Sequence, residues 1–193
     1  MVNLYKPFLV VCEGLSEENY IRALMQAREC LGIRTNIIPK NAGNGQCSHV
    51  VGKFKEVCRQ NKNKAEQVRV WVDDDLYKRN YTDEDRRCAE AFKKVLPDIK
   101  QKFFFSSHNF EDFLALHLDD ETLWGWIDIC RSRNHFSVPM HSGEYMPLVQ
   151  KHLFPNYGKG DLPFELNEAA FRNLFSAQRG SRNPFSQHIR RFS

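Results

Sequence analysis

The chain has 193 residues, of which 41% are hydrophobic and 27% charged, a balance typical of one large soluble domain or of one domain with an extension. No apolar run approaches the roughly 20 residues that a membrane span needs, so no membrane segment is predicted. The net charge of +4 is modest, and the six cysteines form no C-x-x-C pair. With no cleavable leader in the first residues, this pattern favours a cytoplasmic protein with reduced thiols and excludes a disulfide scaffold.

Short apolar runs alternate with helical patterns over the first part of the chain. Strands are predicted at 8–12, 35–39, 68–73 and 102–106. Amphipathic helices are predicted between them, at 16–31 with Ser16 as the cap, at 50–58 and at 88–96. Strands joined by helices of this length form parallel pairs with right-handed crossovers. The sequence therefore predicts an α/β fold with a parallel four-stranded sheet, whose ligands gather at the carboxyl ends of the strands.

The stretch VRVWVDDDL at 68–76 carries the clearest functional signal. A β-branched strand ends there in three consecutive carboxylates, of which Asp73 and Asp75 point to one side of an extended backbone. Like charges at the end of a buried strand are unfavourable unless a cation neutralises them, and two carboxylates aimed at one point suit Mg²⁺. Glu13 follows the first predicted strand and belongs to the same edge. The alternative is an ordinary acidic turn.

The residues after 118 are expected to form a helical elaboration. Helical patterns follow Asn109 and recur at 121–129, after Pro147 and at 167–177. No acid follows Glu168, whereas five arginines do, which suits a polyanionic partner such as nucleic acid. We therefore predict an α/β catalytic core at 1–118 and a helical, basic extension at 119–193 packed on it. A solvated arginine-rich tail is the plain alternative.

Two further side chains are candidates for chemistry, and two others are not. Glu111 opens a helix, where it either adds a carboxylate to a metal site or complements the helix dipole. Lys159 lies between two glycines and can approach a phosphate, or it belongs to an ordinary polar loop. Asp112 is expected to face solvent, and His117 is expected to be a core histidine because it shares an apolar face with Phe113.

Several of these motifs resemble a known family. The Glu-Gly pair at 13–14 and the Asp-x-Asp at 73–75 resemble the TOPRIM domain of topoisomerases, primases and OLD-type nucleases. The segments VCEGLSEENY, FSSHNFEDFLALH, YGK at 157–159 and NPFS at 183–186 resemble RloB-like proteins over nearly the whole chain. The chain departs from that pattern at Phe113, where a Trp is usual, and at Asp74, a third acid within the Asp-x-Asp motif.

The resemblance implies a Mg²⁺-dependent nuclease, with Mn²⁺ as a substitute, that cleaves DNA or RNA such as tRNA in prokaryotic antiphage defence. Its metal ligands would be Glu13, Asp73 and Asp75, and Glu13 could instead act as a general acid or base. If Glu13 bonds only to a neighbouring backbone amide, it is instead a plain strand-end cap. Glu111 and Lys159 would complete the catalytic set. A partner ATPase of the ABC or OLD type is implied as a regulator, and a homo-oligomer is left open.

Two other classes of function fit parts of the pattern. A catalytically silent TOPRIM scaffold would bind nucleic acid or an ATPase without cutting. A phospho-receiver domain is also doubly wound, but it needs a second acid after the first strand and a lysine much nearer the aspartates. The residues do not distinguish DNA from RNA, one metal from two, or one trigger from another.

Overall fold

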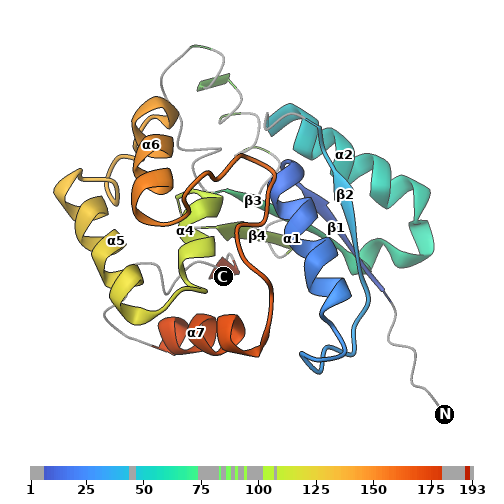
Figure 1. Ribbon diagram of the computed structural model, residues 1–193. Coiled ribbons are helices and arrows are strands. Elements are labelled where there is room, and N and C mark those ends of the chain that lie inside the picture. The colour runs from blue at the N-terminus through green and yellow to red at the C-terminus, as the bar shows by residue number, and fades with distance from the viewer. Residues whose placement is uncertain are drawn as a thin grey trace.

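The computed structural model contains a sheet with helices on both faces (Figure 1). The structure describes residues 7–43, 47–73, 83, 86–87, 90, 94, 102–106, 108–179 and 190–191. Asp75, the helix predicted at 88–96 and the NPFS motif at 183–186 lie largely or wholly outside these residues, and so does most of the basic tail. No described helix is both long enough and apolar enough to cross a membrane.

The sheet has the strand order β2-β1-β3-β4-β5. Its strands are β1 (Phe8–Cys12), β2 (Ile37–Asn41), β3 (Val68–Asp73), β4 (Phe103–Ser106) and β5 (Arg190–Arg191). The β1–β2, β1–β3 and β3–β4 pairs are parallel, which confirms the predicted α/β class, whereas β5 pairs antiparallel with β4 and was not predicted. Two arginines carry no strand pattern that would have indicated it.

The second strand begins two residues later than the predicted start at 35, at Ile37. It includes Pro39, which the prediction took as the end of the strand. Because β2 lies at the edge of the sheet, Pro39 can occupy a position whose missing N–H is not needed by a neighbouring strand.

The helices carry most of the chain that follows β4. Their bounds are α1 (Leu15–Gln26), α2 (Cys47–Gln60), the 3₁₀ helix η1 (Lys62–Gln67), α4 (Phe110–Ala115), α5 (Asp120–Ser132), α6 (Ser142–His152) and α7 (Glu168–Arg179). The helix expected to start near Pro147 starts at Ser142, because the His141 side chain accepts a hydrogen bond from the Gly143 N–H and caps it. Histidine is an uncommon cap, so the predicted start of this helix was too late.

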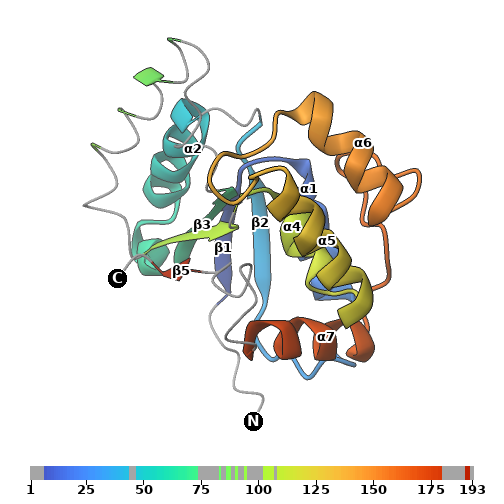
Figure 2. The ribbon, with the colours of Figure 1, turned by 90° about the vertical axis from the view of Figure 1, so that its left-hand side faces the viewer.

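The two faces of the sheet are covered differently. Figure 2 shows α2 on one side and α1, α4, α5 and α6 on the other. On the α2 side the buried cluster is mainly aliphatic, formed by Leu9, Val11, Val50, Phe54, Val57, Val68, Val70 and Val72. Side chains alternate along a strand, so Val10 and Cys12 of the same β1 point to the opposite face and pack with Ile21 of α1.

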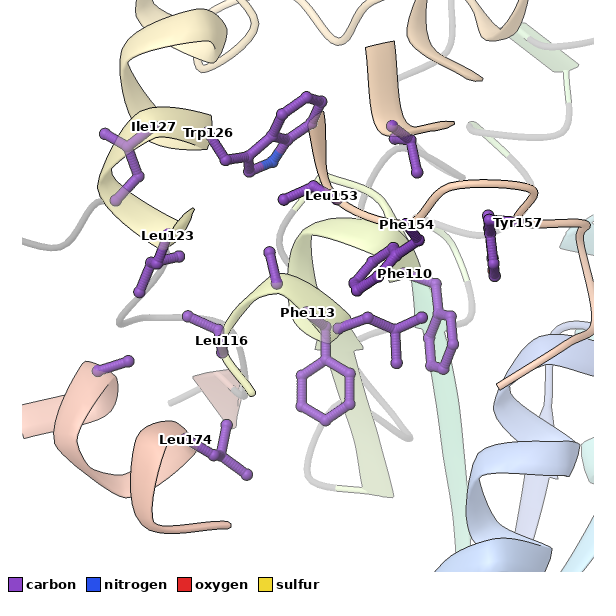
Figure 3. Close-up of a cluster of buried hydrophobic side chains, with 14 of the residues drawn as sticks. Phe110, Phe113, Leu116, Leu123, Trp126, Ile127, Leu153, Phe154, Tyr157 and Leu174 are labelled. Carbon is purple, nitrogen blue, oxygen red and sulfur yellow. The ribbon is translucent and has the colours of Figure 1, made fainter. Parts of the chain in front are cut away.

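The opposite face carries the larger cluster, which is rich in aromatic side chains (Figure 3). Tyr20 of α1 and Trp71 of β3 meet Phe110 and Phe113 of α4 there, with the Tyr20 and Phe113 ring centroids 5.1 Å apart. Leu123 and Trp126 of α5 and residues of α6 and α7 belong to the same cluster. The hydrophobic cluster thus crosses residue 118, and the domain boundary placed there stays a prediction.

Candidate active site

The strand order places a topological switch point between β1 and β3. The chain runs outward from β1 to β2 on one side and from β3 to β4 on the other, so the loops at the carboxyl ends of β1 and β3 diverge. In open α/β sheets, ligands bind in the crevice outside such a point. Glu13 follows β1 directly, and its N–H donates to the Trp71 carbonyl at 3.1 Å, while Asp73 ends β3.

Hydrogen bonds join the two predicted acids at this edge. The Asp73 N–H donates to Glu13 Oε2 at 2.9 Å, and the Phe110 N–H donates to Asp73 Oδ2 at 3.0 Å. The end of β1, the end of β3 and the first turn of α4 are thereby tied together. Each of these bonds engages one oxygen of a carboxylate that has two, and every carboxylate oxygen has two lone pairs.

Glu111 of α4 lies in the same region and is buried, with 5% of its surface exposed. Its Oε1 accepts a hydrogen bond from the Tyr157 hydroxyl at 3.3 Å. Burial raises the pKa of Glu111 above its ordinary value, although the positive charge of Lys159 opposes the shift. Glu111 is thus a buried acid in the first turn of α4, and both of its predicted roles, a carboxylate of a metal site and an acid that complements the helix dipole, stay predictions.

Glu17 is a further buried carboxylate that was not among the predicted site residues. It is 3% exposed, and its Oε2 accepts the Gly14 N–H at 3.0 Å. Burial raises the pKa of Glu17 to about 7, with the charge of Glu111 raising it further and that of Lys159 lowering it. The charge of Lys159 therefore acts on both buried acids, Glu17 and Glu111.

Helical phase could have identified Glu17. It precedes Tyr20 by three residues and Ile21 by four, and both are buried, so Glu17 belongs to the packed face of α1. Glu18, one residue on, points to the other side and pairs with Arg22. Ser16, predicted as the cap, lies inside α1, and the N-cap is Gly14.

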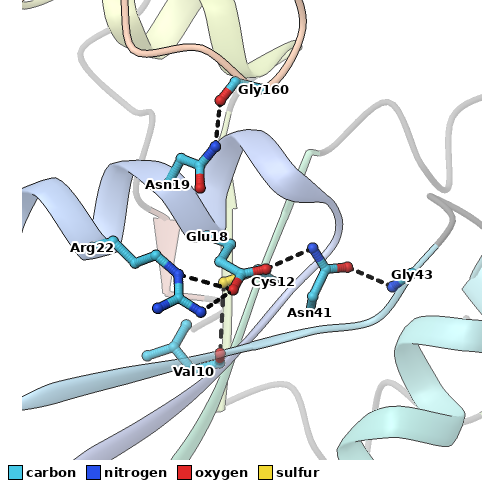
Figure 4. Close-up of polar contacts among 8 residues, drawn as sticks. All are labelled: Val10, Cys12, Glu18, Asn19, Arg22, Asn41, Gly43 and Gly160. Atoms are coloured by element: carbon cyan, nitrogen blue, oxygen red, sulfur yellow. Dashed lines mark hydrogen bonds and ion pairs between the residues drawn. The ribbon is translucent and has the colours of Figure 1, made fainter.

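The loop that carries Lys159 is fastened to the first turns of α1. The Gly160 N–H donates to Ser16 Oγ at 3.1 Å, and the Asn19 side-chain amide donates to the Gly160 carbonyl (Figure 4). Gly160 has a φ of +98°, which favours glycine at this position. The exposed Lys159 is therefore held beside the buried acids Glu17 and Glu111, as its effect on their pKa values indicates.

The same helix also holds the loop after β2. Glu18 accepts a hydrogen bond from the Asn41 side chain at 2.8 Å and pairs with Arg22, and Asn41 Oδ1 accepts from the Gly43 N–H (Figure 4). The pKa of Glu18 is lowered, chiefly by its hydrogen bonds to Asn41 and Arg22. Consecutive glutamates of α1 thus have opposite shifts because only Glu17 is deeply buried.

Asp112 does not face solvent as predicted, because α4 is buried on every side and this aspartate is fully buried within it. One ligand atom each of Asp112, Cys130 and His135 lies within 4.8 Å of the other two. However, the Met140 N–H donates to His135 Nδ1 at 2.9 Å, so the ring proton is on Nε2, which faces Asp112 Oδ2 at 3.0 Å. Burial also raises the pKa of the Cys130 thiol far above its ordinary value. With its proton on Nε2, His135 offers no lone pair to a cation there, so Asp112 and His135 form a buried hydrogen-bonded pair beside Cys130.

His117 is buried as predicted, and its Nε2 lies 2.9 Å from the Tyr20 hydroxyl. Burial lowers the pKa of His117 to about 4, so it is neutral near pH 7. It packs between Phe113 and Phe164 and supports the aromatic cluster rather than the carboxylate edge.

The acids at the carboxyl edge are chemically suited to a hard divalent cation. Glu13, Asp73, Glu17 and Glu111 offer only oxygen donors, and Mg²⁺ is usually bound through one or two carboxylates. A cation would also favour the ionised form of the two acids whose pKa burial raises. Asp75, the third predicted ligand, lies outside the described residues.

The family model for RloB-like proteins matches residues 8–188. This chain belongs to the RloB-like family. The matched region includes Glu13, Asp73, Glu111 and Lys159, and it extends across both the sheet and the helices of this RloB-like protein. Neither a curated protein nor a solved structure matches the chain.

Proposed function

We propose that this RloB-like protein is a metal-dependent nuclease of the TOPRIM type. The observation that supports this most directly is the pairing of Glu13 with Asp73, on adjacent parallel strands at the switch point, through the Asp73 N–H. TOPRIM sites are expected to use a glutamate and an aspartate at these two strand ends. Mg²⁺, with Mn²⁺ as a substitute, would be held by Glu13, Asp73 and Asp75.

Mg²⁺ bound by these carboxylates would neutralise charge that develops during hydrolysis of a phosphodiester. Side chains of the protein would supply the other groups that the hydrolysis needs. Lys159 offers a positive charge to a phosphate, and its loop is fixed by Ser16 and Asn19. Glu17, whose pKa is about 7, can carry a proton at neutral pH, as a general acid or base must. Glu111 is a second buried carboxylate for the same task or for a second cation.

The biological setting follows from the family resemblance. We propose a role in antiphage defence, with DNA or RNA such as tRNA as substrate. A partner ATPase would release the activity of the nuclease only when a trigger arrives, because an unregulated nuclease harms its host. Purified protein alone is therefore expected to need that partner, or Mn²⁺, for full activity.

A cleavage assay tests the proposal. Duplex DNA, single-stranded DNA and total tRNA are incubated with Mg²⁺ or Mn²⁺, with and without an ATPase encoded beside the protein. Wild type is compared with Glu13→Gln, Asp73→Asn and Glu56→Gln, the last a matched change at the exposed surface of α2. Cleavage by wild type and Glu56→Gln, but by neither site variant, would support the proposal and identify the substrate.

The opposite result has a specific meaning. If nothing is cleaved and Mn²⁺ affinity is the same in wild type, Glu13→Gln and Asp73→Asn, the edge is no metal site and a silent scaffold is the better description. Labelling of Asp73 by acetyl phosphate, measured by mass spectrometry, would instead favour the phospho-receiver alternative.

A further inference from the structure

We propose that Asp112, held by His135 and Trp126, is a positioning residue that sets the first turn of α4 against the candidate active site. This inference rests on the proposed function, because it concerns how that site is kept in shape. Asp112 itself touches none of the predicted catalytic groups; it acts through the helical turn to which it belongs.

Three hydrogen-bond donors converge on the buried carboxylate of Asp112. Trp126 Nε1 donates to Oδ1 at 2.8 Å, while His135 Nε2 and the Asn109 N–H reach Oδ2 at 3.0 and 3.3 Å. Burial alone would raise the pKa of Asp112, but its interactions with His135 and the other donors hold the pKa below the ordinary value. The carboxylate is therefore ionised, and its orientation is fixed from two sides.

His135 is fixed in turn by its own neighbours. Its Nδ1 accepts the Met140 N–H at 2.9 Å, which leaves Nε2 as the donor to Asp112. Its ring stacks on Tyr145 of α6 with centroids 5.2 Å apart and meets the His108 ring edge-on at 5.1 Å. His108 has a φ of +64°, an uncommon value for a residue other than glycine, at the bend that leads into α4. The helical region after α4 thus holds both Asp112 and the bend.

The turn anchored by Asp112 delivers two groups to the site. The Phe110 N–H donates to Asp73 Oδ2, and the Glu111 carboxylate accepts from Tyr157. These residues are consecutive with Asp112 and share one rigid helical turn, in which successive residues rise by about 1.5 Å. A small rotation of that turn would displace the Phe110 N–H and the Glu111 carboxylate together, and shifts of this size matter in a metal site.

The sequence gives little indication of this arrangement. Asp112 is separated from His135 by 23 residues, and His135 lies between the helical patterns predicted at 121–129 and after Pro147. The helices α5 and α6 are thereby connected to the carboxyl edge by more than hydrophobic contact. Outer partners of this kind orient the groups that bind a metal, and their loss typically lowers metal affinity 10- to 100-fold.

The test measures Mn²⁺ binding to the full chain by electron paramagnetic resonance. Trp126→Phe removes one donor to Asp112 while keeping an aromatic ring, and Trp124→Phe is the matched change at a partly exposed position of the same helix. His135→Phe removes the second donor, and His135→Gln restores an amide that can donate to Asp112. We expect Trp126→Phe and His135→Phe to weaken Mn²⁺ binding by roughly tenfold. Trp124→Phe should match wild type, and His135→Gln should recover most of the affinity.

The positioning role and a merely structural role predict different patterns. Under the positioning role, affinity for nucleic acid without metal, and the folded fraction by circular dichroism, should stay at the wild-type level in Trp126→Phe. Equal Mn²⁺ affinity in folded Trp126→Phe and wild type, with binding lost in Asp73→Asn, would overturn the positioning role and leave the proposed metal site intact. If Asp73→Asn binds Mn²⁺ as wild type does, the proposed site fails and the positioning role fails with it.

A measurement on the wild-type protein adds a check that needs no variant. Nitrogen-15 NMR of histidine-labelled protein distinguishes the two neutral imidazole tautomers. We expect His135 to carry its proton on Nε2, as the Met140 N–H on Nδ1 requires. A proton on Nδ1 would contradict the contact network and overturn the proposal even if His135→Phe does not fold.

Discussion

On one face of the sheet, α2 packs against valine and leucine side chains of the strands, whereas the other face buries aromatic rings together with titratable groups. Glu17, Glu111, Asp112, His117 and His135 all come from α1, from α4 and from the turns after α4 and α5 on that second face. Burying a charge costs free energy unless hydrogen bonds or opposite charges compensate it. A chain that needed only a stable core could use the same aliphatic packing on both faces.

This difference assigns separate tasks to the two faces. The α2 face stabilises the sheet, and its side chains are exchangeable for others of similar volume. The opposite face holds acids whose pKa values burial has raised, which is a common property of catalytic sites. Substitutions should therefore separate stability from activity according to the face that they alter.

The largest expected effect is on activity, at Glu111. We expect Glu111→Gln to lower the cleavage rate by about a thousandfold, or about 4 kcal/mol, since acid–base groups contribute at this scale. Unfolding in urea should show equal or higher stability, because the variant replaces a buried acid whose ionisation burial disfavours. Glu121→Gln, at the exposed start of α5, is the control. Full activity in Glu111→Gln would remove this residue from the site.

A smaller effect should appear in the pH dependence of stability. The pKa of Glu17 is about 7 in the folded protein and about 4.5 in an unfolded chain, so the folded state binds more protons between these values. The free energy of unfolding should therefore fall as the pH rises from about 4.5 to 7, by at most about 3 kcal/mol. Glu17→Gln should flatten this slope in urea titrations.

Glu18 provides the matched control for that slope. Its pKa is lowered, so its contribution to stability is present above its unfolded pKa and is lost as the pH falls. Glu18→Gln should leave the decline between pH 4.5 and 7 in place. Bound Mg²⁺ should reduce the decline in wild type, since a cation favours ionised carboxylates. An unchanged slope in Glu17→Gln would mean that another group causes it.

The α2 face should respond in stability alone. Val57 of α2 is buried in the aliphatic cluster, and Val57→Ala should lower the free energy of unfolding by about 2 kcal/mol through lost burial and a small cavity. The cleavage rate per folded molecule should not change. Val138→Ala, at an exposed position, should alter neither quantity. A slower reaction in fully folded Val57→Ala would show that the two faces are coupled.

The sequence was sufficient for the features that depend on local pattern. Alternating valines and the abrupt acids predicted β3, and the parallel connections placed Glu13 and Asp73 at one edge, as the structure does. Glu17 was not among the predicted site residues, although its helical phase with Tyr20 indicated burial.

Other features depend on contacts between distant segments and carry no local signal. Asp112 is buried because α5 and α6 cover α4, and its partner His135 lies in a segment without a regular pattern. Ser16 was predicted to cap α1, but its hydroxyl accepts from Gly160, which is 144 residues away. Such pairings follow from the packing of the helical region on the sheet, which hydrophobic periodicity does not specify.

The smallest expected effect is on the cleavage rate, and it distinguishes the two hydrogen bonds that attach loops to α1. Asn19 donates to the Gly160 carbonyl beside Lys159, whereas Asn41 donates to Glu18 at the edge strand. Asn19→Ala and Asn41→Ala each remove one hydrogen bond and should each cost about 1 kcal/mol of stability. Only Asn19→Ala should also slow cleavage, by a few-fold, because it loosens the loop that presents Lys159 to the acids. If Asn19→Ala and Asn41→Ala cleave at equal rates while Lys159→Ala is still impaired, Ser16 alone fixes this loop. If Asn19→Ala, Asn41→Ala and Lys159→Ala all cleave at equal rates, Lys159 lies outside the reaction.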